Sequence, residues 1–383
     1  MNQKFYDDLI HRSMTGHQLE DALCQRILTD SQTCLPDRQV ELLPLINAAY
    51  TVRQHYRGKE VIIHIINNAQ NGHCQEDCHY CAQAKSSQAD IQEYGLKSDE
   101  EMLEEARQAY AKGAFRYCMV YAGRGALPAR IKRLSGLIRK IKEEYPCQEI
   151  CVSTGLVTPE GALELKKAGL DQLNHNLNTS EGFYPRICTT HTFADRLNTL
   201  QAARLAGIHL CSGVIVGMGE SHNDIIEAAK RLRSLKVESL PVNFLVPIDG
   251  NQLSVPQGLT PEFCLKVLCL FRFLNPQAEI RIGAGREIHL RNMEILALYP
   301  ANSLFLQGYL NTKGSSNART LQMIKDAGFE IKSDVNIDDL LVETRQPVVS
   351  VVEPYLVSTK AAIKDLKDLR PALVVSEVEP LKS

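Results

Sequence analysis

Three cysteines, Cys74, Cys78 and Cys81, are the residues of this sequence best suited to chemistry. They are spaced C-x3-C-x2-C and follow an apolar run, 61–66, that is typical of a β-strand. Cysteine thiolates bind iron–sulfur clusters, and three thiolates on a cluster of four irons leave one iron without a protein ligand. An open iron of this kind can bind a small molecule through its amino and carboxylate groups. The spacing therefore predicts a cluster with a site for such a molecule.

Zinc is the main alternative for this loop, because His73 and His79 lie beside the cysteines and could complete a structural site. Zinc loops of that kind more often carry paired C-x2-C knuckles. A disulfide would leave one of the three cysteines unpaired, and nothing else in the sequence indicates export. The spacing favours an iron–sulfur cluster over either alternative.

The composition argues against several classes of protein. The 383 residues carry 43 Lys and Arg against 45 Asp and Glu, and this balance gives no basic face for nucleic acid. No apolar run approaches the ~20 residues of a membrane span. The polar, acidic start has no signal-peptide core. We therefore expect a cytoplasmic protein, where disulfides are rare, and metal or redox chemistry should account for part of the 12 cysteines.

Short apolar runs alternate with longer amphipathic stretches from residue 60 onward, as expected for strands that alternate with helices. Strands are predicted at 61–66, 115–121, 149–153, 172–176, 209–216, 239–246, 279–282 and 303–306. Helices are predicted between them, at 99–112, 129–144, 159–168, 192–206, 222–235 and 261–274. This order matches an α/β fold, a (β/α)8 TIM-type barrel over 57–332, with a doubly wound open sheet as the alternative.

The two ends of the chain lie outside this pattern. Residues 1–56 read as helical and are expected to form a cap or an oligomer contact. Residues 333–383 are expected to form an extension that wraps the barrel or stays mobile, with a helix-like piece near 358–369. Neither end carries residues whose pattern indicates chemistry.

Four further residues lie on separate predicted strands: Cys118, Cys151 and Cys211 on the second, third and fifth, and Arg281 on the seventh. If each faces the barrel interior, three thiols and one guanidinium converge there. Any single cysteine is more often a buried packing residue. An arginine within a strand is different, because an unpaired buried charge is very costly. It needs an anionic partner, and a thiolate-bound iron–sulfur cluster is one.

These motifs resemble those of a known family. The cysteine loop, with Tyr80 before its last cysteine, is similar to the signature of the radical SAM superfamily. The stretch from about 64 to 330 resembles the biotin synthase family in the order and spacing of its motifs. The matching segments are Leu-Asn-His-Asn-Leu-Asn at 173–178, Cys-Ser-Gly-Val-Ile-Val-Gly-Met-Gly-Glu at 211–220, Pro-Val-Asn-Phe at 241–244 and Gly-Ala-Gly-Arg-Glu at 283–287. The resemblance implies a barrel of the radical SAM kind and a radical sulfur insertion that converts dethiobiotin to biotin.

The resemblance also implies a role for each matched residue. It assigns a 4Fe-4S cluster to Cys74, Cys78 and Cys81, and a sulfur-donating 2Fe-2S cluster to Cys118, Cys151, Cys211 and Arg281. It assigns the contacts with S-adenosyl-L-methionine to Tyr80, Asn176, Asn178 and Arg196, although Arg196 could instead be a solvated helix residue. It assigns the contacts with the substrate's ureido ring to Asn174, Asn176 and Asn243. A carboxamide suits a cyclic urea, because both offer a donor and an acceptor.

Three positions depart from the family pattern. Asn178 stands in place of an aspartate and is a neutral, weaker acceptor. His191 stands where some members have arginine, and Val214 replaces a second glycine after Cys211. The glycine run 213–219 lacks the spacing of a dinucleotide fingerprint and is expected to let the backbone approach the adenine of S-adenosyl-L-methionine. The remaining cysteines are expected to tolerate substitution: Cys24, Cys34, Cys147, Cys188, Cys264 and Cys269.

The expected partners follow from the same resemblance. They are dethiobiotin, an electron donor such as flavodoxin or ferredoxin, the iron–sulfur assembly machinery and a second copy of the chain, without nucleic acid or membrane. Two alternatives remain: a radical SAM enzyme with another small-molecule substrate, such as a hydrogenase-cofactor maturation enzyme or an amino-acid mutase, and a non-enzymatic iron–sulfur or zinc scaffold. The inner thiol set argues against the first, and the asparagines at strand ends argue against the second.

Overall fold

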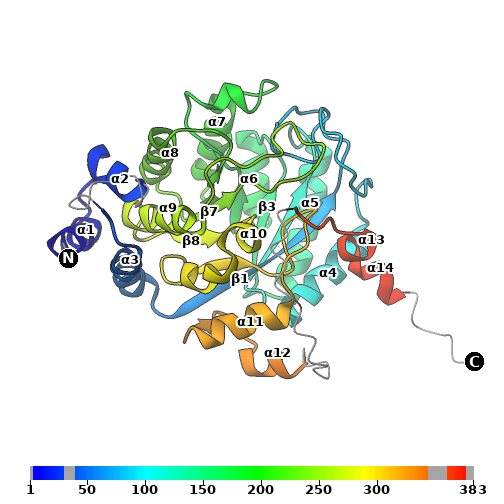
Figure 1. Ribbon diagram of the computed structural model, residues 1–383. Coiled ribbons are helices and arrows are strands. Elements are labelled where there is room, and N and C mark those ends of the chain that lie inside the picture. Colours follow the sequence, from blue (N-terminus) through cyan, green and yellow to red (C-terminus); the bar gives the residue numbers. More distant parts are fainter. Residues whose placement is uncertain (1–2, 30–38, 344–359, 377–383) are drawn as a thin grey trace, which may run out of the picture.

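The computed structural model describes residues 3–29, 39–343 and 360–376, and its centre is a closed barrel of parallel strands (Figure 1). The strands are β1 (Glu60–Gln70), β2 (Arg116–Tyr121), β3 (Glu149–Ser153), β4 (Gln172–Asn174), β5 (His209–Cys211), β6 (Val214–Val216), β7 (Ser239–Phe244), β8 (Glu279–Ile282) and β9 (Ser303–Phe305). They pair in chain order except that β5 pairs with β7 and the short β6 pairs beside it with the end of β7. β1 pairs with β9 to close the barrel, and β10 (Glu330–Ile331) pairs with the start of β1. The predicted barrel is confirmed, and the open-sheet alternative is wrong.

The predicted strand 209–216 is divided in the structure. It forms β5 and β6, with Ser212 and Gly213 between them. A Cβ on Gly213 would lie 1.8 Å from the carbonyl oxygen of Pro241, so the chain passes β7 more closely than any side chain permits. The break lets β6 pair with the last part of β7 and bring its residues to the carboxyl end of the barrel.

Helices surround the barrel and follow the strands in turn. They are α4 (Asp99–Ala111), α5 (Pro128–Glu144), α6 (Pro159–Lys167), α7 (Phe193–Leu205), α8 (His222–Ser234), α9 (Pro261–Leu274), α10 (Arg286–Leu290), η2 (Arg291–Leu298) and α11 (Asn317–Asp326). Capping boxes at Ser98, Thr192 and Ser221 fix the starts of α4, α7 and α8, because each side chain accepts a backbone N–H of the first turn. No helix among the described residues is both long and apolar enough to cross a membrane.

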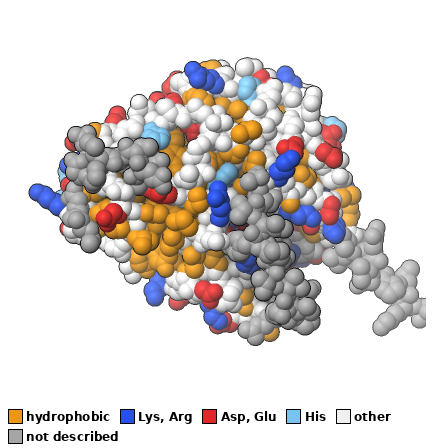
Figure 2. Space-filling model, viewed as in Figure 1, with side chains coloured by type: hydrophobic (Ala, Val, Ile, Leu, Met, Phe, Trp, Pro, Cys, Tyr) orange, Lys and Arg blue, Asp and Glu red, His pale blue; other side chains and the backbone are white. Residues whose placement is uncertain are grey.

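The N-terminal helices lie on the outside of the barrel. They are α1 (Gln3–Thr15), α2 (Asp21–Leu28) and α3 (Leu42–Arg57), and α1 and α3 pack against α9. The hydroxyl of Ser13 donates to the carbonyl of Phe273 at 2.9 Å, and the Arg53 side chain donates to that of Ala301 at 3.0 Å. Figure 2 shows hydrophobic side chains gathered on the visible face beside α3, where Leu43 is 66% exposed.

The C-terminal strap, defined here as Lys360–Arg370, lies against loops at the carboxyl end of the barrel. Its backbone N–H of Lys364 donates to Asn311, and its Ala362 carbonyl accepts from Lys313, both at 2.8 Å. The strap ends in α13 (Leu366–Leu369), followed by α14 (Pro371–Ser376), beside α4 in Figure 1. Before the strap, α12 (Ile337–Glu343) packs on α11. Much of the predicted extension, 344–359 and 377–383, lies outside the described residues.

Candidate functional site

A cavity of about 260 Å³ opens at the carboxyl ends of the barrel strands. Its walls come from the cysteine loop after β1, the asparagine segment after β4, the end of β7 and the loop 309–312 after β9. In barrels of this type the active site lies at this end, because the loops that follow the strands converge there. The three loop cysteines, Tyr80 and the four asparagines singled out in the sequence all line this one cavity.

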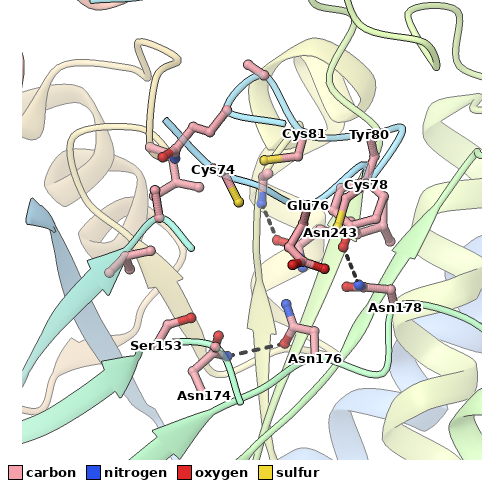
Figure 3. Close-up of a pocket in the computed structure, with 18 of the residues that line it drawn as sticks. Cys74, Glu76, Cys78, Tyr80, Cys81, Ser153, Asn174, Asn176, Asn178 and Asn243 are labelled. Atoms are coloured by element: carbon pink, nitrogen blue, oxygen red, sulfur yellow. Dashed lines mark hydrogen bonds between the residues drawn. The ribbon is translucent and has the colours of Figure 1, made fainter. Parts of the chain in front are cut away.

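The three cysteines of the loop are presented to one end of the cavity. Figure 3 shows the sulfur atoms of Cys74, Cys78 and Cys81 near one another above the asparagines. The loop has no regular helix or strand, and turn-type hydrogen bonds hold it, among them Cys81 N–H to the Cys78 carbonyl at 3.0 Å. Burial raises the pKa of the Cys81 thiol to about 11. Binding of a metal would therefore release a proton from this thiol.

Neither histidine of the zinc alternative joins a ligand group. Among the described residues, one set of three possible metal ligands comes together within 4.8 Å, and it consists of Cys78, Cys188 and His191. The side chain of His73 is 63% exposed and lies 3.9 Å from the Glu93 carboxylate. The zinc interpretation based on His73 and His79 therefore has no geometric support.

Two carboxylates inside the cysteine loop connect it to the segment before α7. Asp77 Oδ1 accepts from the backbone N–H groups of Thr189 at 3.0 Å and Thr190 at 3.2 Å. Glu76 Oε2 lies 2.6 Å from Nδ1 of His191. Sequence reasoning missed this connection, which joins residues 115 positions apart. The only available signal was two acidic residues between cluster-type cysteines.

The connection continues from His191 to Arg196. Arg196 donates from Nη2 to Nε2 of His191 at 2.8 Å, which leaves the ring proton on Nδ1, facing Glu76. Arg196 also donates to the backbone carbonyl of Asn176 at 2.7 Å and to the hydroxyl of Tyr184, in the short helix η1 (Tyr184–Arg186). The side chain is buried, so the alternative of a solvated helix residue is wrong. The hydroxyls of Tyr184 and Tyr80 both accept from this guanidinium at the cavity wall.

Asn178 lies beside this cation and is also buried. Its amide donates to the hydroxyl of Tyr80 at 2.6 Å, as drawn in Figure 3. The backbone of Asn178 has a φ of 71°, in the left-handed region that asparagine adopts more readily than most residues. Tyr80, Asn178 and Arg196 thus form one continuous wall of the cavity.

The other three asparagines line the opposite side and the floor. The Asn174 amide donates to Asn176 Oδ1 at 3.2 Å, and Asn176 Oδ1 accepts the backbone N–H of Gly213 at 3.0 Å. Asn243 differs from the sequence expectation, which aimed its carboxamide at a ligand. Its Nδ2 donates to the Val214 carbonyl at 3.0 Å, and its Oδ1 accepts from Ala284 at 2.9 Å. One N–H and one lone pair of this carboxamide remain for a ligand.

Below the cavity, the second set of predicted residues converges inside the barrel. Cys118 and Cys151 are register partners on β2 and β3, and Cys211 ends β5. Arg281 on β8 donates from Nη2 to Cys211 Sγ at 3.6 Å. The hydrogen bond from Cys151 and the charge of Arg281 lower the pKa of Cys211 to about 5. Cys118, Cys151 and Cys211 form one buried cluster with Phe305. A separate cavity of about 30 Å³ is lined by Cys118, Cys151 and Arg281 among others.

This inner set fits an anionic, thiolate-bound group. The three sulfur atoms are soft ligands at most 5% exposed. The Nε of Arg281 is buried and has no hydrogen-bond partner within the described part of the chain. A buried donor without a partner is costly, and an anion among the thiols would satisfy it. The residues present therefore fit an iron–sulfur cluster.

A buried ion network supports the inner set from below. Glu279 accepts from Nη2 of Arg281 at 3.2 Å, from Nη1 of Arg116 at 2.8 Å, and lies 2.8 Å from Nε2 of His64. Burial opposes ionisation of this carboxyl, but Arg116 and His64 outweigh it and hold its pKa well below the ordinary value. The sequence interpretation identified a cluster as the anionic partner of Arg281 and missed Glu279, two residues away on the same strand.

Comparisons with known proteins place this site in a family context. The radical SAM superfamily model matches residues 71–232, and the Biotin and Thiamin Synthesis associated domain matches 241–330. The biotin synthase of Magnetococcus marinus is 55% identical over 80% of this chain and 96% of its own length. That of Bacillus subtilis is 42% identical over 87% of this chain and 96% of its own length.

Solved structures share the fold at much lower identity. Methylornithine synthase has a TM-score of 0.70 and 19% identity over 87% of this chain and 99% of its own. The FeFe-hydrogenase maturase HydG from Carboxydothermus hydrogenoformans has a TM-score of 0.71 and 19% identity over 87% of this chain and 80% of its own. These likenesses establish the barrel architecture alone, because their identity is too low to carry a reaction.

Proposed function

The chain belongs to the biotin synthase family of radical SAM enzymes, and from this premise we propose that it converts dethiobiotin to biotin by sulfur insertion. The observation that carries the proposal is the inner set of Cys118, Cys151, Cys211 and Arg281 directly below the substrate-sized cavity. An enzyme that only abstracts hydrogen has no need of a second thiol set there. Other radical SAM reactions can use the same barrel, so the barrel by itself does not distinguish among them.

The chain offers two separate ligand sets for iron–sulfur clusters. Cys74, Cys78 and Cys81 would hold a 4Fe-4S cluster, and the inner set would hold a 2Fe-2S cluster. When bound, the first cluster with S-adenosyl-L-methionine supplies a radical that removes hydrogen from unactivated carbon, and the second supplies the sulfur atom. The barrel's own contribution is to hold the reacting carbon between the two sets and to exclude water and oxygen.

The wall formed by Tyr80, Asn178 and Arg196 would hold S-adenosyl-L-methionine. Arg196 offers a buried guanidinium to the carboxylate, with its direction fixed by His191 and the Asn176 carbonyl. Asn176 and Asn178 offer polar side chains to the ribose hydroxyls, and Tyr80 holds the Asn178 amide. Because these groups are already bonded to one another, little ordering is required when the ligand binds.

The ureido ring of dethiobiotin would lie against the asparagines on the floor. Asn174, Asn176 and Asn243 line the cavity, and each retains hydrogen-bonding capacity beyond the contacts described above. Asn174 also donates to Cys211 Sγ at 3.2 Å, so the floor touches the inner thiol set directly. A ring bound there would place its methyl and methylene carbons within reach of a sulfur held by the inner set.

We further propose a homodimer, a flavodoxin- or ferredoxin-type electron donor, the iron–sulfur assembly machinery as a partner and a cytoplasmic location. The face beside α3 supports the dimer, because hydrophobic side chains gather on it (Figure 2) and Leu43 of α3 is largely exposed. The 4Fe-4S set lies at the cavity, where a donor protein could approach it, and not in the barrel interior. The described helices give no membrane span.

Anaerobic turnover tests the proposal. Reconstituted protein is incubated with dethiobiotin, S-adenosyl-L-methionine and a reductant, and biotin is measured by mass spectrometry. The wild type should form biotin, and Cys151→Ala should cleave S-adenosyl-L-methionine without forming biotin. Formation of biotin by Cys151→Ala, or no biotin from a wild type that carries both clusters, would contradict the proposal.

A further inference from the structure

Cys188 is a buried thiol that the proposed function does not use. It lies outside the C-x3-C-x2-C motif, is 2% exposed, and its Sγ lies 3.8 Å from Sγ of Cys78. It was expected from the sequence to be replaceable without effect. Its contact with a proposed cluster ligand calls for a different interpretation, which rests on the 4Fe-4S assignment above.

The position of Cys188 is set by the backbone around it rather than by the thiol contact. The carbonyl of Ile187 accepts the N–H of His79 at 3.0 Å, and Asp77 accepts the N–H groups of Thr189 and Thr190. These bonds tie the segment on both sides of Cys188 to the cysteine loop. The backbone on both sides of Cys188 is therefore fixed against the cysteine loop independently of the thiol contact.

Two other roles for this thiol do not fit the geometry. Cys78 and Cys188 are both free thiols in nonbonded contact at 3.8 Å, and a disulfide between them would remove the Cys78 thiolate that the cluster needs. A metal held by Cys78, Cys188 and His191 would need a free ring nitrogen. Nδ1 of His191 is engaged by Glu76 and Nε2 by Arg196, so a metal there would have to break one of these bonds.

The direction of the sulfur–sulfur hydrogen bond follows from chemistry. Cysteine binds iron as a thiolate, which has no proton to donate. In the structure the Cys78 thiol donates to Cys188. Once Cys78 is an iron-bound thiolate it can only accept, so the direction reverses and Cys188 becomes the donor. Two oxygens compete as acceptors, Asp77 Oδ1 at 3.3 Å and Thr190 Oγ1 at 3.6 Å from Cys188 Sγ, while Nδ1 of His191 lies 3.3 Å from the same sulfur. Asp77 Oδ1 already accepts the backbone N–H groups of Thr189 and Thr190, and the Thr190 hydroxyl has its shorter bond, 2.6 Å, to Glu76.

We propose that Cys188 donates an S–H hydrogen bond to the Cys78 sulfur of the 4Fe-4S cluster and raises the reduction potential of that cluster. A hydrogen bond to a cluster sulfur stabilises the reduced form more than the oxidised form, because the reduced cluster carries more negative charge. Cys188 is a positioning residue for electron uptake. It touches a ligand of the cluster and binds neither the iron nor the substrate.

A redox titration of the 4Fe-4S cluster, followed by electron paramagnetic resonance, tests this role. Cys188→Ala removes the donor, and its midpoint should shift to a more negative potential, so that a smaller fraction is reduced at a fixed donor potential. Cys188→Ser keeps a donor and should restore most of the wild-type midpoint. The matched control is Cys264→Ala, a buried cysteine on α9 that contacts no proposed ligand.

The outcomes separate this inference from the proposed function. An unchanged midpoint in Cys188→Ala, with full iron content, would overturn the inference. Loss of about four irons in that variant would also overturn it, because Cys188 would then be required for cluster assembly. A wild type that shows the cluster signal but forms no biotin would refute the proposed function and leave the potential shift measurable.

Discussion

Cys118 on β2 and Cys151 on β3 occupy directly paired positions of adjacent parallel strands. Their side chains therefore leave the sheet on the same face, toward the barrel interior, where Cys211 of β5 completes the buried cluster. Three separate strands hold these thiols, whereas a single loop holds Cys74, Cys78 and Cys81. The two ligand sets depend on different parts of the fold and should be lost separately.

Removing one ligand set should leave the other cluster intact. Fully reconstituted wild type should hold about six irons, Cys78→Ala about two and Cys151→Ala about four. Cys78→Ala should lose cleavage of S-adenosyl-L-methionine, and Cys151→Ala should keep some of it. Iron and sulfide analysis with visible spectra measures this, and Cys147→Ala, an exposed cysteine, is the control. If both variants lost the same spectral component, two separate sites would not exist.

Asn243→Leu should weaken dethiobiotin binding by one to two orders of magnitude. The change removes a polar contact to the ligand, at about 1–3 kcal/mol per unsatisfied group. It also leaves the Val214 carbonyl and the Ala284 N–H without partners, so the midpoint of unfolding should fall as well. Dethiobiotin titration of the protein loaded with S-adenosyl-L-methionine measures the affinity.

The control for this variant is Asn275→Leu, which removes a buried amide bonded to the Ala229 carbonyl, away from the cavity. It should lower stability without changing dethiobiotin affinity. Iron content and S-adenosyl-L-methionine binding should be nearly unchanged in both variants. Equal dethiobiotin affinity in Asn243→Leu and the wild type would remove Asn243 from the binding site.

His191→Leu should weaken binding of S-adenosyl-L-methionine by about tenfold. Arg196 loses the acceptor that fixes its Nη2, and hydrogen bonds to charged groups contribute about 1.5–3 kcal/mol. His191→Gln keeps an acceptor and should recover part of the affinity. Equilibrium binding of S-adenosyl-L-methionine measures the effect, with His209→Leu, an exposed histidine, as the control. No change in His191→Leu would mean that Arg196 does not depend on this contact.

The strap should detach from the barrel as the pH falls. Glu101 pairs with Arg370 of the strap. Burial raises the pKa of Glu101, but the hydrogen bonds from Arg370 and Ser98 outweigh this effect and lower the pKa below its ordinary 4.5. A lowered folded-state pKa stabilises the attached strap above pH 4.5, and this stabilisation is lost as the pH falls through the folded-state value. Hydrogen exchange of loop 309–313 should accelerate in the same range.

Arg370→Ala should produce the same opening at neutral pH. Loss of the pair with Glu101 costs about 1 kcal/mol, so exchange in loop 309–313 should rise about fivefold. Arg107→Ala, which removes an exposed pair with Glu144 on the outside of the barrel, is the control. Unchanged exchange in Arg370→Ala would show that other contacts hold the strap, such as that of Lys97 with the Leu369 carbonyl at 2.6 Å.

The barrel and the inner thiol set could be predicted because their signals are local. Alternating apolar runs mark each strand, and a cysteine or arginine within such a run is placed by its strand alone. The break between β5 and β6 could not be predicted from periodicity, since it results from contact of Gly213 with Pro241 on β7. A contact between two strands depends on how they approach each other in the folded barrel, and the sequence pattern within one strand does not show this.

The supporting contacts of the site were missed for the same reason. Glu76 contacts His191 across 115 positions, and Cys78 contacts Cys188 across 110. Neither His191 nor Cys188 lies in a sequence pattern that indicates its partner. Glu279 was missed because a carboxylate at the start of a strand is usually solvated, whereas Arg116 and His64 hold this one in the barrel.

The inner cavity adjoins the upper one. Asn174, Asn176 and Tyr309 line both, so the two spaces are stacked. On the other side, Arg116, Glu279 and His64 fill the barrel with buried, mutually bonded side chains. A substrate bound on the asparagine floor, as proposed, would therefore lie between the upper cavity and the inner thiols. Resupply of iron or sulfide through the upper cavity would then have to follow release of the product.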